Sequence, residues 1–134
     1  MESNPSIPTL VADDDPDILS YFRAIFKNTP YDLHYAQNGL EALKKAKLQK
    51  YDLAFIDVNM PEMDGLQTLM NWKKIQPNTQ IIIISSYGDG NLVRKAIQEG
   101  AYSYLFKPLN KMDIFSITMK CLKNTGIENA VSFK

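Results

Sequence analysis

Acidic, hydroxyl and amine side chains stand at the ends of short apolar runs along this sequence. They are Asp13, Asp14 and Asp15 after residues 9–12, Asp57 after residues 53–56, Ser85 and Ser86 after residues 81–84, and Lys107 after residues 104–106. Crowded carboxylates repel one another in a partly desolvated site unless a cation shares it. Mg²⁺ suits such a set, and a lysine ammonium is a compact charge that proteins use against phosphate oxygens. The set predicts a site that holds a phosphoryl group in line with a carboxylate nucleophile.

Parallel strands would bring these side chains together. The apolar runs are too short for buried helices and predict five strands at residues 9–12, 33–36, 53–56, 81–84 and 104–106. Two of them, 53–56 and 81–84, are apolar at every position, as in a parallel sheet covered by helices on both faces. The strands therefore belong to a central sheet.

Segments with apolar residues at helical spacing separate the strands and predict five amphipathic helices. Their marker residues are Ile18, Phe22, Ile25 and Phe26; Leu40, Leu43 and Ala46; Leu66, Leu69 and Met70; Leu92, Val93, Ala96 and Ile97; and Ile114, Ile117 and Cys121. Right-handed crossovers then give an α/β, doubly wound sheet whose crevice lies at the carboxyl ends of the strands.

Several polar residues have a simpler interpretation than chemistry. Asp15 and Asp17 are assigned to the start of the first helix, where negative side chains are favourable. Asn38 and Asn110 can cap the second and fifth helices, and Gly100 can end the fourth. The lysines of the second helix, Lys44, Lys45, Lys47 and Lys50, are interpreted as a solvated face, and His34 as a packed or edge residue rather than a ligand.

Composition narrows the functional class. The chain has 134 residues, with 15 Lys plus Arg against 15 Asp plus Glu, so it lacks the basic excess that nucleic-acid binding favours. No stretch approaches the roughly 20 apolar residues that span a bilayer, and no membrane association is expected. The single cysteine, Cys121, cannot form a disulfide within the chain. We expect one cytoplasmic domain.

Four motifs make the chain resemble the receiver (CheY-like) domain of bacterial two-component response regulators. They are Val-Ala-Asp-Asp-Asp-Pro-Asp-Ile-Leu (11–19), Asp-Val-Asn-Met-Pro-Glu-Met-Asp-Gly (57–65), Ile-Ser-Ser-Tyr-Gly-Asp (84–89) and Gly-Ala-Tyr-Ser-Tyr-Leu-Phe-Lys-Pro-Leu (100–109). The resemblance covers residues 8–123, so residues 1–7 are predicted to be a tail and 124–134 a second tail or the start of a linker. It implies a flavodoxin-like fold, five parallel strands in the order 2-1-3-4-5 with five helices.

The resemblance also implies a role for each site residue. Asp57 matches the phosphoacceptor, and Lys107 the lysine that pairs with the phosphoryl group and is followed by a cis peptide bond to Pro108. Mg²⁺, or Mn²⁺, would be held by Asp13, Asp14, Asp57 and the backbone carbonyl of Asn59. Ser85 matches the switch hydroxyl and Tyr104 the switch aromatic that turns inward. Packing alone would make an aromatic at position 104 semi-buried, while Tyr102 is expected at the surface. Pro61 and Gly65 would shape the loop after the acceptor.

The implied function is that of a phosphoacceptor in a His-Asp phosphorelay, with self-catalysed phosphotransfer and autodephosphorylation but no conventional enzyme activity. A sensor histidine kinase or histidine phosphotransfer protein would phosphorylate it. The face formed by the fourth helix, fifth strand and fifth helix would then control a protein target or a fused output domain. In one large subgroup of response regulators, those with winged-helix output domains, the position of Ser103 is acidic and helps to form a salt-bridged receiver dimer. Ser103 argues against that dimer here.

Three alternatives remain. An aspartyl-phosphate enzyme of the haloacid dehalogenase type requires a second aspartate at position 59, where this chain has Asn59. A flavodoxin-like FMN protein would need hydroxyls and free amides after the first strand, where this chain has carboxylates. A degenerate receiver would act as a phosphorylation-independent interaction module, and the complete acceptor set argues against it.

Overall fold

Five parallel strands form the centre of the protein. The computed structural model describes residues 6–61, 63–86, 88 and 90–123. In it the strands are β1 (Ile7–Ala12), β2 (Tyr31–Ala36), β3 (Leu53–Asp57), β4 (Gln80–Ser86) and β5 (Ser103–Lys107). They pair in the order β2-β1-β3-β4-β5, all parallel, as the resemblance implied.

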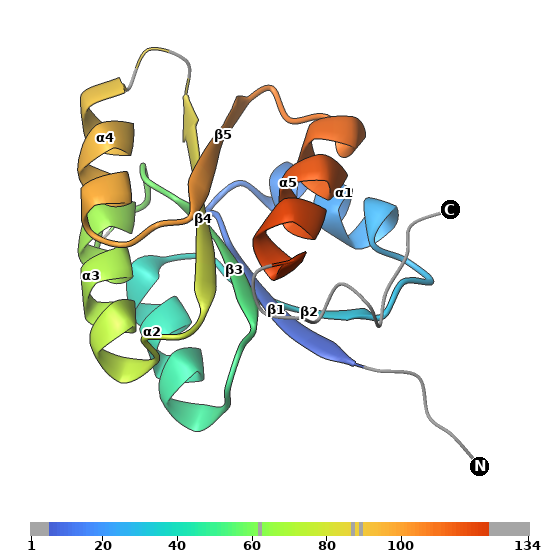
Figure 1. The fold of residues 1–134 in the computed structure, drawn as a ribbon, viewed down its shortest axis with the longest axis horizontal. Helices are drawn as coiled ribbons and strands as arrows, with labels where there is room; N and C mark the ends of the chain where they lie inside the picture. The colour runs from blue at the N-terminus through green and yellow to red at the C-terminus, as the bar shows by residue number, and fades with distance from the viewer. Residues whose placement is uncertain (1–5, 62, 87, 89, 124–134) are drawn as a thin grey trace.

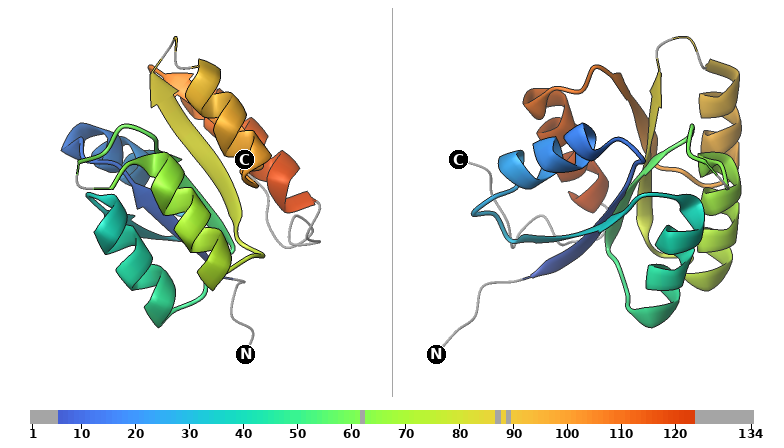
Figure 2. Two further views of the ribbon diagram at one scale, coloured as in Figure 1. Left: turned by 90° about the vertical axis from the view of Figure 1, so that its left-hand side faces the viewer. Right: turned by 180° about the vertical axis from the view of Figure 1, so that it is seen from behind.

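Helices cover both faces of the sheet. They are α1 (Pro16–Ile25), α2 (Gly39–Leu48), α3 (Gly65–Ile75), α4 (Gly90–Gln98) and α5 (Lys111–Lys123). Figure 1 shows α1 and α5 on one side of the sheet, and Figure 2 shows α2, α3 and α4 side by side on the other. The predicted doubly wound architecture is confirmed. Within the described residues, no helix is long and apolar enough to cross a membrane.

The alternation of side chains along the buried strands builds two cores. Ile82 and Ile84 of β4 pack with Phe22 and Phe55 on the α1 and α5 side. The intervening Ile83 packs with Trp72 and other residues on the α2, α3 and α4 side. Because successive side chains of a strand point to opposite faces, an uninterrupted isoleucine run can serve both cores.

Local capping explains where the helices begin and end. Oδ1 of Asp15 accepts a hydrogen bond from the Asp17 amide at 2.9 Å. Asn38 accepts one from the Glu41 amide at 2.8 Å, and Asn110 one from the Asp113 amide at 2.9 Å. Gly100, at φ +112°, follows α4 in the left-handed region that glycine favours. The caps predicted from sequence are confirmed.

Two details of the prediction are wrong. Ile7, assigned to the amino-terminal tail, is the first residue of β1, pairs with Tyr31 and is buried. Leu40, Met70 and Ile97, which marked core-facing helix positions, are 51%, 40% and 41% exposed. On α2 the buried positions include small residues, Gly39, Ala42 and Ala46, so this helix packs closely through them and Leu40 faces outward. Residues 124–134 lie outside the described residues.

Gly39 marks the closest of these contacts. A Cβ at this position would lie 2.2 Å from Oγ1 of Thr68 and 2.8 Å from the backbone oxygen of Met63. The absence of a side chain therefore lets the start of α2 rest against α3 and the loop before it.

We predict that Gly39→Ala lowers the free energy of unfolding by about 1–3 kcal/mol, because the added methyl group forces the α2 contact apart. Gly90→Ala is the matched control, since its Cβ would meet nothing within 4 Å. Urea denaturation of both variants checks this. Equal stabilities would show that the α2 contact adjusts without cost.

Candidate functional site

The predicted site residues meet at the carboxyl edge of the sheet. Asp13 directly follows β1, Asp57 is the last residue of β3, and Lys107 is the last residue of β5. Oxygen atoms of Asp13, Asp14 and Asp57 all lie within 4.8 Å of one another. Parallel strands end at the same edge, which is why residues so distant in sequence become neighbours.

Lys107 joins the two buried carboxylates. Its Nζ donates a hydrogen bond to Oδ2 of Asp57 at 3.0 Å and lies 3.2 Å from Oδ2 of Asp13. The Asp57 and Asp13 residues are only 2% and 0% exposed, whereas the Lys107 side chain is 26% exposed. The ammonium therefore comes from the rim and neutralises charges in the interior of the site.

Asp57 has both of its carboxylate oxygens engaged. Oδ1 accepts a hydrogen bond from the Asn59 amide at 2.9 Å, and Oδ2 accepts the one from Lys107. Asn59 thus contacts Asp57 through its backbone N–H, while the role predicted for its carbonyl stays a prediction. These two donors fix the orientation of the carboxylate.

Burial and the neighbouring charges shift the pKa values of Asp13 and Lys107. Burial, helped by the nearby charge of Asp57, raises the pKa of Asp13 to about 6, although the Asp15 amide and Lys107 oppose the shift. Burial would lower the pKa of Lys107, but its hydrogen bond to Asp57 and the charges of Asp57 and Asp13 outweigh burial and raise it. Each group therefore favours a positive charge in the centre of the cluster.

The cluster fits a hard divalent cation. Its three carboxylates supply oxygen ligands, the kind that Mg²⁺ prefers, and Asp14 is exposed and so accessible to an ion with bound waters. Oδ2 of Asp13 is fully buried, and the Lys107 ammonium 3.2 Å away offsets its charge. An additional positive charge would relieve this crowding.

The loop after Asp57 depends on Gly65. A Cβ on Gly65 would lie 2.3 Å from the backbone oxygen of Asp57 and 2.4 Å from Cα of Val58. The Gly65 amide also donates to the Val58 carbonyl at 3.0 Å. The resemblance implied that Gly65 shapes this loop, and the close approach gives a physical reason.

Ser85 and Tyr104 occupy different environments. Ser85 is buried at the end of β4, and its Oγ donates to the Ser86 carbonyl at 3.2 Å. Because Asp57 pairs with Ile84, Ser85 lies one residue beyond the level of Asp57 on the adjacent strand. Tyr104 is 41% exposed, so the semi-buried position expected from packing is wrong. Tyr102, expected at the surface, is instead half-buried against the core.

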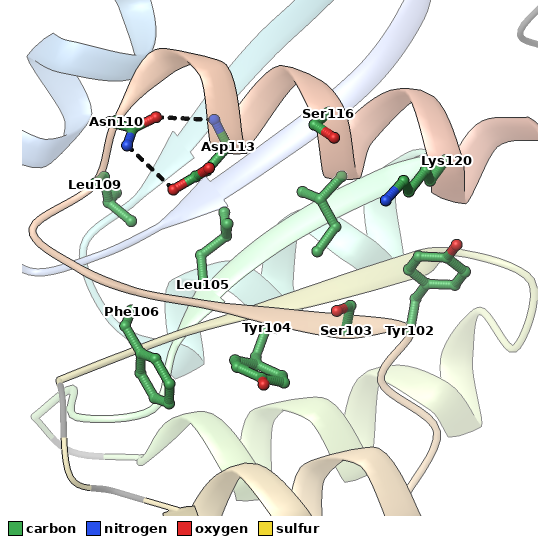
Figure 3. Close-up of a pocket in the computed structure, with 11 residues that line it drawn as sticks. Tyr102, Ser103, Tyr104, Leu105, Phe106, Leu109, Asn110, Asp113, Ser116 and Lys120 are labelled. Atoms are coloured by element: carbon green, nitrogen blue, oxygen red, sulfur yellow. Dashed lines mark hydrogen bonds between the residues drawn. The ribbon is translucent and has the colours of Figure 1, made fainter.

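A groove of about 550 Å³ runs between β5 and α5, with Tyr102, Ser103, Leu105, Ser116 and Lys120 among its lining residues. Figure 3 shows Tyr104 and Phe106 projecting from β5 on the side away from α5. Their rings contact each other with centroids 5.0 Å apart. Sequence patterns did not reveal this groove, because a helix and an edge strand form it together. The Lys107–Pro108 peptide bond, between the lining residues Phe106 and Leu109, is cis, as implied.

His34 and Lys45 both make polar contacts near β2. Nδ1 of His34 lies 2.9 Å from the Tyr51 hydroxyl and Nε2 lies 3.2 Å from Asp32, which confirms a packed edge position. Lys45 is not simply solvated, since its Nζ donates to the Tyr35 carbonyl. The Asp13–Lys107 ion pair was not predicted, because the sequence gives no distance between the ends of β1 and β5.

The strand order and acidic edge define a flavodoxin-like α/β domain of the CheY-like type. The family model described as "Response regulator receiver domain" matches residues 9–118, and the chain belongs to this family of two-component signal-transduction domains.

Relatives of two kinds match the chain. The transcriptional regulatory protein ZraR of Escherichia coli K12 is 32% identical over 123 residues, which cover 92% of this chain and 28% of ZraR. The chemotaxis protein CheY of Listeria monocytogenes is 32% identical over 115 residues, which cover 85% of this chain and 97% of CheY. The chain thus spans about a quarter of the length of the ZraR relatives, 24% in the ZraR of Klebsiella oxytoca, and nearly the whole length of CheY.

Solved structures show the same fold. A CheY-like receiver domain protein from Methanospirillum hungatei JF-1 has a TM-score of 0.84 at 26% identity, with 92% of this chain and 98% of that chain covered. CheY in the CheX–CheY–BeF₃–Mg complex of Borrelia burgdorferi has a TM-score of 0.81 at 28% identity, with 87% and 89% covered. Receiver domains generally bind Mg²⁺ at an acidic pocket, and Asp13, Asp14 and Asp57 form such a cluster here.

We predict that, in the absence of divalent ions, Asp13→Asn becomes more stable relative to the wild type as the pH rises. The folded protein holds the Asp13 proton more tightly than the unfolded chain, so the free energy of unfolding falls as the pH rises from about 4 to about 6 and stays lower above it. The variant should escape this loss. Its stability relative to wild type should therefore increase by about 3 kcal/mol across that interval.

Urea denaturation in EDTA at a series of pH values measures the difference. If the gap between the two proteins did not change with pH, burial would not be holding a proton on Asp13.

Proposed function

We propose that this chain is the phosphoacceptor of a His-Asp phosphorelay and that Asp57 receives the phosphoryl group. The observation that carries the proposal is the setting of Asp57: a buried carboxylate at a strand end, between the Lys107 ammonium and the Asn59 amide and beside two further carboxylates. Positioning and charge neutralisation are what phosphoryl transfer requires from a protein.

In the transfer step, a carboxylate oxygen of Asp57 bonds to phosphorus as the phosphorus–nitrogen bond of a phosphohistidine breaks. The electron pair returns to the imidazole nitrogen, which takes up a proton. Lys107 can then pair with the new phosphoryl oxygens or with Asp13. The hydrogen bond from the Asn59 amide to Oδ1 of Asp57 keeps the carboxyl group in its orientation. The same residues would catalyse hydrolysis of the acyl phosphate, so the chain is a signalling phosphoacceptor rather than a conventional enzyme.

Asp13, Asp14, Asp57 and the carbonyl of Asn59 are the residues that would hold Mg²⁺, with Mn²⁺ as a substitute. A bound ion supplies charge neutralisation for the phosphoryl oxygens. The oxygen-only donor set and the crowding of buried charge around Asp13 support this assignment.

Ser85 and Tyr104 are proposed as the switch. The phosphoryl group adds close to two negative charges and new acceptor oxygens at the edge of the sheet. The buried Ser85 hydroxyl, now on the Ser86 carbonyl, would turn to it, and Tyr104, now exposed, would move inward. The α4, β5 and α5 face would change as the population shifts between two packed states.

The proposed partners follow from this chemistry. A sensor histidine kinase or a histidine phosphotransfer protein would donate the phosphoryl group, and a target protein or fused output domain would respond to the α4, β5 and α5 face. The match to part of ZraR supports a fused arrangement, and the full-length match to CheY supports a separate target. Cytoplasmic location stays a prediction.

We predict that acetyl phosphate adds a single phosphoryl group to the wild-type protein in the presence of Mg²⁺ and none to Asp57→Asn. Intact-mass spectrometry with and without Mg²⁺ measures the adduct. Asp52→Asn, which changes a half-exposed aspartate just before β3, is the control and should be labelled normally. A persistent adduct on Asp57→Asn would move the acceptor elsewhere. Failure to bind both acetyl phosphate and beryllofluoride would favour the interaction-module alternative.

We predict that Lys107→Ala folds but responds weakly to phosphorylation, because its ammonium links the β5 end to the acceptor while its stem is not part of the core. Circular dichroism should be unchanged, whereas the amide shifts that beryllofluoride causes in β5 should shrink at least several-fold in NMR spectra. Lys120→Ala, an exposed lysine of α5, is the control. An undiminished response of Lys107→Ala would assign the ammonium a purely structural role.

A further inference from the structure

The outward face of α2 carries two leucines that the described part of the chain leaves uncovered. Leu40 is 51% exposed and Leu48 is 78% exposed. They stand two helical turns apart with the exposed Lys44 between them, so the three residues lie along one line of the helix. Together with Glu41 and Lys45 they border a groove of about 390 Å³. We call this line and its groove, together with the exposed Lys47, seven residues after Leu40 on the same face, the α2 ridge.

The α2 ridge lies opposite the packed side of the helix. The buried residues of α2 are Gly39, Ala42, Leu43 and Ala46, and these make the contact with α3 and the sheet. Leu40 and Leu48 therefore lie on the exposed side of α2 and are not part of the core. Large apolar side chains grouped on an exposed surface are typical of binding sites.

The charge of the α2 ridge is positive. Lys44 and Lys47 are exposed, and no ion pair joins either of them to a carboxylate among the described residues. The one acidic residue of the helix, Glu41, accepts a hydrogen bond from the Gln37 amide and so is held at the helix start. Because the whole chain has a formal net charge of zero, this excess is local to α2.

We propose that the α2 ridge binds an acidic amphipathic helix of another protein. Two leucines separated by about 12 Å along α2 match apolar residues that recur over two turns of a partner helix. Glutamate or aspartate beside those residues would face Lys44 and Lys47. A small anchor of this type gives a weak and reversible contact whose specificity comes from charge.

A second copy of this chain fits the α2 ridge poorly. In a twofold contact the same surface faces itself, so two antiparallel α2 helices that pair Leu40 with Leu48 would bring Lys44 of each copy together. The repulsion disfavours self-association. The proposal does not depend on chemistry at Asp57, because the α2 ridge is built from residues outside the acidic cluster.

Fluorescence anisotropy can test the proposal with a blocked, labelled synthetic helix. Its leucines recur at helical spacing (i, i+3, i+7), and its remaining positions are glutamate and alanine. A second peptide has lysine in place of each glutamate. We expect the wild-type protein to bind the glutamate peptide more tightly, and the affinity to fall as sodium chloride is raised.

Variants locate the contact. Leu40→Ser combined with Leu48→Ser should weaken binding at least about tenfold, whereas Met112→Ser is the matched control because Met112 on α5 is also 78% exposed. Lys44→Glu combined with Lys47→Glu should reverse the preference between the two peptides. Lys111→Glu combined with Lys120→Glu, on α5, should not. Circular dichroism verifies that each variant is folded.

Several outcomes would overturn the proposal. They are no binding of the glutamate peptide, equal binding of both peptides, or binding that the α2 variants leave unchanged. Sedimentation with vesicles of anionic phospholipid tests a membrane instead, and vesicle binding without peptide binding would replace the helix by a lipid surface. Self-association that the leucine variants abolish, measured by analytical ultracentrifugation, would replace it by a second copy.

Discussion

The ion pairs of Lys107 with Asp57 and Asp13 are the interaction on which the site depends. Two buried carboxylates at the ends of β1 and β3 would repel each other strongly in a low-dielectric edge. Lys107 enters from β5 and lies 3.0 Å from Asp57 and 3.2 Å from Asp13. The sheet therefore holds two negative charges at the ends of its inner strands β1 and β3 and a positive charge that comes from its edge strand β5. Because Lys107 is the last residue of β5 and pairs directly with Asp57, the charge at Asp57 is linked electrostatically to the end of the edge strand.

The strand order decides how far each side chain must reach to join this cluster. In the order β2-β1-β3-β4-β5, β1 and β3 are neighbours, and β4 separates them from β5. A short side chain at the end of β1 or β3 meets its neighbour directly, whereas a residue at the end of β5 must reach across β4. Lysine has the length and flexibility for this. Ser85, at the end of the intervening strand, lies along the same path.

Much of this was predictable from sequence because the strongest signals coincide with the buried centre. The isoleucine run of β4 and the apolar run before Asp57 identify strands covered on both faces, and the caps at Asp15 and Asn38 locate helix starts. Leu40 was misplaced because helical period alone does not show which stripe packs; the small residues Gly39, Ala42 and Ala46 decided it. Tyr104 is more exposed and Tyr102 more buried than the sequence predicted, because β5 is an edge strand and the exposure of its side chains depends on whether α5 covers them. Distances such as that of Lys107 to Asp13 depend on tertiary structure and carry no sequence pattern.

The small residues that turn Leu40 outward also fix α2 relative to the site. Gly39 approaches Met63 and Thr68 so closely that a Cβ would overlap them, and Met63 belongs to the segment between Asp57 and α3. Gly65 brings the other end of that segment against the backbone of Asp57. Two close glycine contacts therefore connect β3, the loop that follows it and α2, through the backbone of Asp57 and Met63 and the side chain of Thr68. Because close-packed interiors have low compressibility, these contacts hold the α2 ridge in a defined position relative to Asp57, although the two features use different residues and different chemistry.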